Sequence, residues 1–242
     1  MTDSSPKPEN ASDKESAEIS TELEERSILH ISARTAMVLM IFVVIFTALM
    51  AATYQATISP IEASAKKEKL ALISEVLPPE NYDNALLDDW LELAPTQELG
   101  LTEPTRIFRA RKGSEITALV IEAAASDGYS GRIGLLLAVK VSGELLAVRV
   151  TDHRETPGLG DYIVPKKDKN KAQPWITQFN GLKLTTVTPA QWRVKKDGGR
   201  FEQRAGATIS ARAVTNASSR ALAWLNSNQA RLLAAKTGTR VE

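Results

Sequence analysis

The stretch ITALVIEAAASDGYSGRIGLLLAVKVSGELLAVRVTD, residues 116–152, decides the fold of this chain. Three runs within it, 116–125, 133–141 and 145–152, are rich in aliphatic and β-branched residues. The runs are separated by Asp127–Gly131 and Val141–Glu144, whose Gly, Asp and Ser residues are typical of tight turns. This pattern predicts an antiparallel meander, and therefore an α+β domain with an antiparallel sheet and packed helices.

Beyond these runs the sequence favours helices and one more strand. A helical turn is expected at Trp175–Phe179 and a strand at Leu182–Val187. Trp175 and Trp192 are expected in the core. The last element is a long helix, Ser210–Ala235, whose apolar face is formed by Val214, Ala217, Ala221, Trp224 and Leu225.

Before the domain, Ala36–Tyr54 (AMVLMIFVVIFTALMAATY) contains no charged residue. As a helix these residues would extend about 28 Å, close to the hydrocarbon thickness of a bilayer. We therefore predict one membrane-spanning helix, residues 35–56, with Tyr54 at the interface. A buried core helix is the first alternative, but this segment is apolar on every face. A cleaved signal peptide is the second, but the preceding leader is long and acidic.

The chain is thus expected to have four parts. Residues 1–34 form an acidic disordered tail, and residues 35–56 cross the membrane. Residues 57–104 form a helical stalk, Ile61–Leu77, ended by Pro78 and Pro79, and a short amphipathic helical segment, Asn81–Leu93. Residues 105–242 form the soluble domain.

The formal net charge of the 242-residue chain is only +1, but its charges are unevenly distributed. Residues 1–35 hold 4 basic and 8 acidic residues, residues 55–165 hold 11 and 17, and residues 166–242 hold 15 and 4. The basic residues of the last part are interspersed along a helix and loops with few exposed aromatics, so nucleic-acid binding is not expected.

The chain has no cysteine and only two histidines, His30 and His153. Disulfides, thiolate-bound zinc, iron–sulfur clusters and Cys-linked haem are therefore excluded. We expect no metal ligands, and any redox chemistry must use an organic cofactor.

Two glycine-containing loops are candidate binding elements. The first is Glu155–Gly160 (ETPGLG), in which two glycines allow unusual backbone angles and close approach of a ligand; a plain tight turn is the alternative. The second is Gly206–Ser210 (GATIS), just before the last helix, whose free N–H groups and dipole suit a phosphate. Arg204 and Arg212 would add positive charge, and helix capping by Thr208 or Ser210 is the alternative.

Four motifs occur in order: D-G-Y-S-G at 127–131, H-R-E-T-P-G-L-G-D at 153–161, W-x-x-Q-F-x-G at 175–181 and G-A-T-I-S-A-R-A-V at 206–214. Together they resemble the FMN-binding domain of the RnfG protein, a component of the Rnf (Rsx) electron transport complex. The chain is similar, more distantly, to the flavin-carrying NqrC protein of the sodium-pumping NADH:quinone reductase. The resemblance covers most of the chain, including Val76–Asn84.

This resemblance implies FMN bound covalently through its phosphate to a threonine. The family pattern is Asp-x-x-Ser/Thr-Ser/Gly-Ala-Thr, and a Mg²⁺-dependent flavin transferase attaches the group from FAD. The matching segment is Glu202–Thr208, which makes Thr208 the expected acceptor, with Gly206 and Ala207 beside it. Glu202 stands where Asp is usual and Ala205 where a hydroxyl residue is usual. Ser210 and Thr215 are less favoured acceptors.

The resemblance also implies contacts to the flavin ring. Thr156 and backbone N–H groups of its loop would hydrogen-bond the ring, and Glu155 would disfavour an anionic reduced flavin or relay a proton. Tyr129 would stack on the ring, with a half-buried turn tyrosine as the alternative. The complete expected cofactor-binding set is Tyr129, Ser130, Glu155, Thr156, Pro157, Gly158, Leu159, Gly160, Gly206, Ala207 and Thr208. No catalytic acid, base or nucleophile is expected.

The function implied is that of an electron-carrying flavoprotein within a membrane-bound ion-translocating oxidoreductase (Rnf/Rsx) complex. Its partners would be the other subunits of the complex, the lipid bilayer and, transiently, the flavin transferase. The implied location is the bacterial inner membrane, with a single span and a periplasmic C-terminal domain; the charges flanking the span do not decide the orientation. The alternative function, which rests on Ala205, is a membrane-anchored binding or scaffold module without covalent flavin.

Overall fold

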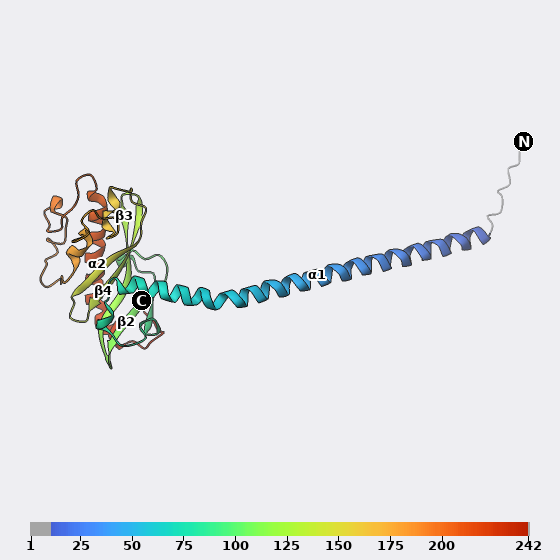
Figure 1. Ribbon diagram of the computed structural model, residues 1–242, viewed down its shortest axis with the longest axis horizontal. Coiled ribbons are helices and arrows are strands. Elements are labelled where there is room, and N and C mark those ends of the chain that lie inside the picture. The colour runs from blue at the N-terminus through green and yellow to red at the C-terminus, as the bar shows by residue number, and fades with distance from the viewer. Residues whose placement is uncertain (1–10, 242) are drawn as a thin grey trace, which may run out of the picture. The chain divides into compact units, whose positions relative to one another are not determined.

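A six-stranded sheet forms the centre of the C-terminal part of the chain (Figure 1). The structure is a computed structural model that describes residues 11–241. The strands are β1 (Trp90–Leu93), β2 (Thr105–Lys112), β3 (Glu115–Gly128), β4 (Gly131–Lys140), β5 (Leu145–Asp152) and β6 (Arg240–Val241). Their order across the sheet is β5-β4-β3-β2-β1-β6.

The predicted meander is confirmed. Strands β3, β4 and β5 coincide with the three apolar runs and pair antiparallel, with Val120 opposite Ala138 and Leu137 opposite Val148. Tyr129 and Ser130 form the turn between β3 and β4. The α+β fold class is confirmed as well.

The sheet is larger than the sequence predicts, and it is mixed rather than purely antiparallel. Sequence analysis missed β1, β2 and β6, and β6 pairs parallel with β1. Strand β2 escaped notice because its sequence, TRIFRARK, looks too polar for a central strand. In the structure Arg109 is only 1% exposed, because its guanidinium donates hydrogen bonds to Asp89, the Ala235 carbonyl and Thr237.

Both faces of the sheet are covered, which explains why its strands read as nearly continuous apolar runs. Helix α2 (Thr208–Ala234) packs on one face, over side chains such as Leu135 and Leu137. On the other face, Leu136 lies in a cluster with Ile73 and Val76. Figure 1 shows α2 running along the sheet beside β3 and β4.

Two predicted elements have a different structure. The strand at Leu182–Val187 is wrong: the segment forms turns, and only Leu182 makes a β-bridge, to Leu145. Its alternation of Leu and Thr imitates a strand, but the Thr186 side chain and the Val187 N–H both donate to the Lys183 carbonyl within a local turn. The helical segment at Asn81–Leu93 is also wrong, since a short 3₁₀ helix there, Leu86–Asp88, leads into β1.

The remaining helices lie near their expected positions. The turn at Trp175–Phe179 is a 3₁₀ helix, and Trp175 and Trp192 are both buried, as predicted. Helix α2 begins at Thr208, two residues earlier than predicted. This earlier start places Thr208 in the first turn of the helix.

Helix α1 (Ala11–Ser74) contains the predicted membrane span. By length and composition, its part from Ile31 onward can cross a membrane. Every side chain from Ile31 to Thr57 is exposed, which contradicts the alternative of a buried core helix. The helix also extends to Ala11, within the segment expected to be disordered, because residues 11–30 are rich in helix formers such as Ala, Glu and Leu. The rest of the predicted tail, residues 1–10, lies outside the described residues.

The chain forms two compact units, Met1–Ser64 and Ala65–Glu242. The second unit includes the end of α1, where Ile73, Val76 and Leu77 are fully buried against the sheet. The predicted stalk therefore ends as part of the domain core.

Candidate functional site

A pocket of about 240 Å³ brings together the loops that the sequence singles out. It is lined by Tyr129, Glu155, Thr156, Leu159, Gly160, Gly206, Ala207, Ile209 and Ser210. Three of these side chains are large, apolar and exposed: Tyr129 is 67% exposed, Leu159 54% and Ile209 42%. Among the described residues, all other exposed large apolar side chains belong to α1. The pocket rim is therefore the one place on the domain where apolar surface gathers, which is typical of a binding site.

The buried carboxylate of Glu155 holds the pocket together. Glu155 is 3% exposed. It accepts a hydrogen bond of 3.0 Å from the Ser130 N–H in the β3–β4 turn. Its other oxygen accepts a hydrogen bond from the Ser210 hydroxyl in the first turn of α2. The sequence-based expectation places Glu155 at the ring edge; although it lines the pocket, both of its oxygens already have partners.

Two glycines of the same loop serve different purposes. Gly158 has a φ of +78°, which favours glycine. Gly160 is needed for space: a Cβ there would lie 2.6 Å from the Ser210 Oγ and 2.9 Å from Glu155 Oε2. The loop can therefore approach the start of α2 only because residue 160 has no side chain.

The loop satisfies its own backbone. The N–H groups of Leu159 and Gly160 each donate to the Thr156 carbonyl at 3.1 Å, and the Gly158 N–H donates to Asp161 at 2.8 Å. These N–H groups are not free for a ligand, as the sequence-based expectation required. The Thr156 hydroxyl has no partner among the described residues, so it is the loop's available hydrogen-bonding group. Pro157 and Gly158 shape the turn without lining the pocket.

Helix α2 starts beside the pocket without a side-chain cap. The N-cap residue is Ala207, and no side chain bonds the first turn. Thr208, half-buried between the lining residues Ala207 and Ile209, makes no side-chain hydrogen bond to the described residues. The alternative of capping by Thr208 or Ser210 is therefore wrong. An uncapped N-terminus leaves N–H groups and the positive end of the helix dipole for an anion.

The other two acceptor candidates are occupied. The Ser210 hydroxyl is bonded to Glu155, and Ser210 is 2% exposed. Thr215 is completely buried in α2. Thr208 is therefore the accessible hydroxyl among the three candidates.

The arginines expected to strengthen the anion site are already paired. Arg204 pairs with the buried Asp168, and Arg212 forms two hydrogen bonds, of 2.5 and 2.8 Å, with Asp197. The hydrogen bonds from Arg212 lower the pKa of Asp197, which keeps this carboxylate ionised in its pair. The local positive field at Thr208 therefore comes mainly from the helix N-terminus.

Sequence analysis missed the residues that support the turn before Thr208. The Tyr162 hydroxyl bonds the backbone at Arg204 and Ala207, and the Trp175 indole N–H donates to the Glu202 carbonyl. Tyr162 immediately follows the G-L-G-D motif, but nothing in a single sequence shows that its hydroxyl reaches residues 204–207. Asp168, hidden in a lysine-rich loop, gave no signal either.

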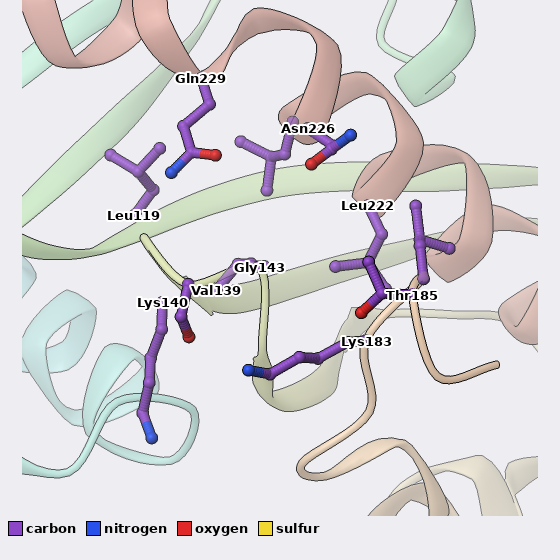
Figure 2. A pocket seen from close by; sticks show the side chains of 12 residues that line it. Leu119, Val139, Lys140, Gly143, Lys183, Thr185, Leu222, Asn226 and Gln229 are labelled. Carbon is purple, nitrogen blue, oxygen red and sulfur yellow. The ribbon is translucent and has the colours of Figure 1, made fainter.

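A second pocket, shown in Figure 2, lies between the β4–β5 turn, residues 183–185 and α2. Its volume is about 90 Å³, too small for a flavin. Two of its polar side chains are engaged: Gln229 donates to the Val141 carbonyl and Lys140 pairs with Glu144. This pocket is therefore a weaker candidate for the cofactor than the one beside Thr208.

Comparison with known proteins supports the site. Residues 128–223, which contain every segment lining the pocket, match the FMN-binding domain family, and residues 28–76 match the RnfG N-terminal region. The chain is 41% identical over 201 residues to the G subunit of an ion-translocating oxidoreductase complex from Pseudomonas aeruginosa (strain UCBPP-PA14), covering 83% of this chain and 92% of the relative. It is 46% identical over 176 residues to the protein of the same name from Escherichia coli O157:H7, covering 72% of this chain and 82% of the relative.

The contact between Gly160 and Ser210 can be tested by stability measurements. Gly160→Ala should lower the free energy of unfolding by about 1–3 kcal/mol, because its Cβ overlaps the Ser210 Oγ. Ser210→Ala removes that oxygen, so the double variant should lose less stability than the sum of the two single variants. Denaturant unfolding of the full-length protein in detergent measures both. Strict additivity would show that the loop and helix do not touch here.

Proposed function

Because the chain belongs to the family of ion-translocating oxidoreductase complex G subunits, we propose that it carries electrons on FMN attached covalently through a phosphoester to Thr208. The flavin supplies one- and two-electron redox chemistry. The protein supplies attachment, orientation and the surroundings of the ring. This division of roles fits a chain that has no cysteine for a metal cluster.

The observation that carries the proposal is the state of Thr208. Its hydroxyl has no hydrogen-bond partner among the described residues, and it stands at the uncapped start of a 27-residue helix. A phosphodiester formed there remains anionic at any working pH and lies at the positive end of the helix dipole. Both features are unfavourable for an empty helix terminus and favourable for one that holds a phosphate.

The apolar rim supports the placement of the ring. Tyr129, Leu159 and Ile209 offer exposed apolar surface to a flat ring, and the Thr156 hydroxyl is available to hydrogen-bond its edge. The pocket is shallow, so part of the ring would remain exposed. Exposure suits a carrier that exchanges electrons with other proteins.

The attachment step needs no catalytic residue of this chain. With FAD as donor, the Thr208 oxygen forms a bond to the FMN phosphorus, and the bond from that phosphorus to the bridging oxygen breaks. AMP leaves with the electron pair, and the hydroxyl proton passes to a base of the flavin transferase or to water. No oxidant or reductant is consumed.

The two departures from the family motif lie on the surface in this structure. The Glu202 side chain is 61% exposed and pairs with Lys195, and Ala205 is exposed. Neither replaces a group that holds the acceptor turn, whose supports come from other segments. The structure around Thr208 is therefore compatible with attachment despite Glu202 and Ala205.

The proposal includes partners and location. The other subunits of the complex would exchange electrons with the flavin, and α1 would anchor the chain in the bacterial inner membrane. The C-terminal domain would lie in the periplasm. There, a covalent bond prevents loss of a flavin that could not easily be replaced.

Covalent attachment can be tested by intact mass. Full-length protein co-expressed with a flavin transferase should gain one FMN residue and show in-gel flavin fluorescence. Thr208→Ala should lose both, because it removes the acceptor oxygen, whereas Thr208→Ser should keep them.

Thr215→Ala is the matched control and should still be modified, because this buried hydroxyl is not an acceptor. FMN retained by Thr208→Ala would refute the assignment of the acceptor. Unmodified wild-type protein, under conditions that load a known RnfG protein, would favour a scaffold module without covalent flavin.

The orientation can be tested with a reporter fused after Glu242. A reporter that is active only outside the cytoplasm should be active, and one that is active only inside should be silent. The opposite result would contradict the periplasmic placement.

A further inference from the structure

We propose that Tyr162 is a positioning residue for flavin attachment: its hydroxyl fixes the Arg204–Ala207 turn so that Thr208 is presented to the flavin transferase. This inference rests on the proposed function, because it concerns the same acceptor. It assigns a role to a residue that lies outside the acceptor motif and does not line the pocket.

The Tyr162 hydroxyl bridges both ends of the turn. It accepts a hydrogen bond from the Arg204 N–H and donates one to the Ala207 carbonyl, each 3.2 Å long. Within the turn, the Ala207 N–H donates to the Arg204 carbonyl at 3.1 Å, and Gly206 has a φ of +81°. One phenol thus closes a four-residue turn whose next residue is the acceptor.

The phenol is itself held in place. Tyr162 is 1% exposed and packs edge-on against Trp175, with ring centroids 5.5 Å apart. The Arg204 guanidinium lies 4.8 Å from the centre of its ring. Burial raises the pKa of Tyr162, so the hydroxyl keeps the proton that it donates to Ala207. A transferase cannot touch so buried a side chain, so any effect of Tyr162 must act through the turn.

The residues before the turn are fixed from the same side. The Glu202 N–H donates to Gln178 at 2.7 Å, and the Glu202 carbonyl accepts from the Trp175 indole. Asp168, 1% exposed, pairs with Arg204 and accepts a 2.6 Å hydrogen bond from the Trp175 N–H. Ala205 and Gly206, in contrast, are exposed.

This arrangement suits an acceptor that must be offered in one geometry. The turn lies on the surface, where a short segment would otherwise be mobile, yet its backbone is bonded at Glu202, Arg204 and Ala207 by side chains from other segments. Group transfer is sensitive to the placement of the attacking atom, since an error of about 1 Å can cost about a hundredfold in rate. Fixing the backbone before Thr208 therefore lowers the cost of reaching the reactive geometry.

The test compares Tyr162→Phe with wild type as full-length protein in detergent. Purified flavin transferase, Mg²⁺ and FAD are added, and FMN incorporation is followed by intact mass. Removing the hydroxyl should slow the maximal rate about tenfold or more, with little change in the transferase concentration that gives half-maximal rate. Tyr82→Phe, in the cluster on the opposite face of the sheet, should react at the wild-type rate.

Hydrogen exchange of the unmodified proteins gives a second readout. Tyr162→Phe should raise exchange in peptides covering 203–210 and leave β3 and β4 unchanged. Leu86→Ala controls for general destabilisation, because it opens a cavity in the opposite cluster; at a temperature where it remains folded, it should be modified at the wild-type rate.

Each outcome decides the inference. A wild-type rate for Tyr162→Phe, unchanged exchange at 203–210, or an equal loss of rate in Leu86→Ala would overturn it. If wild-type protein is never modified, attachment to Thr208 fails, and the role of Tyr162 in attachment fails with it. The exchange data would then still show whether the hydroxyl holds the turn.

Discussion

The buried carboxylate of Glu155 joins three parts of the chain that are far apart in sequence. It lies in the loop after β5, accepts a hydrogen bond from the β3–β4 turn at Ser130, and accepts another from Ser210 in the first turn of α2. A buried carboxylate without partners is costly, so these segments are stable together in a way that none is alone. The absence of a side chain at Gly160 makes the close approach possible. The pocket exists because this interaction holds.

Around this centre, most polar groups bond one another, and few remain for a ligand. Arg204 and Arg212 are paired with carboxylates, and the loop N–H groups bond within the loop. The Thr208 hydroxyl, the uncapped helix start and the apolar rim are what remain. Such a site fixes a phosphate at one point and leaves a ring partly open, which fits a carrier better than an enclosed catalytic centre.

The sequence predicted the parts of this protein that depend on local pattern. The apolar runs of β3 to β5, the last helix, the charge-free span and the glycine loops were all readable. Strand β2 was not, because Arg109 is buried by partners at Asp89, Ala235 and Thr237 that only the folded chain brings together. The supports of the acceptor turn were missed for the same reason, as the Tyr162 hydroxyl acts across 42 residues to reach Arg204. Glu155 was placed in the site, but its structural role depends on contacts that one sequence does not reveal.

The most direct test of this account is hydrogen exchange by mass spectrometry on Glu155→Ala, compared with wild type, as unmodified full-length protein. The account predicts faster exchange in three separate segments, 127–131, 155–160 and 207–211, because all three lose the same partner. Glu144→Ala, which removes a surface pair with Lys140, should leave them unchanged. Faster exchange confined to 155–160 in Glu155→Ala would contradict the claim that one carboxylate assembles the site.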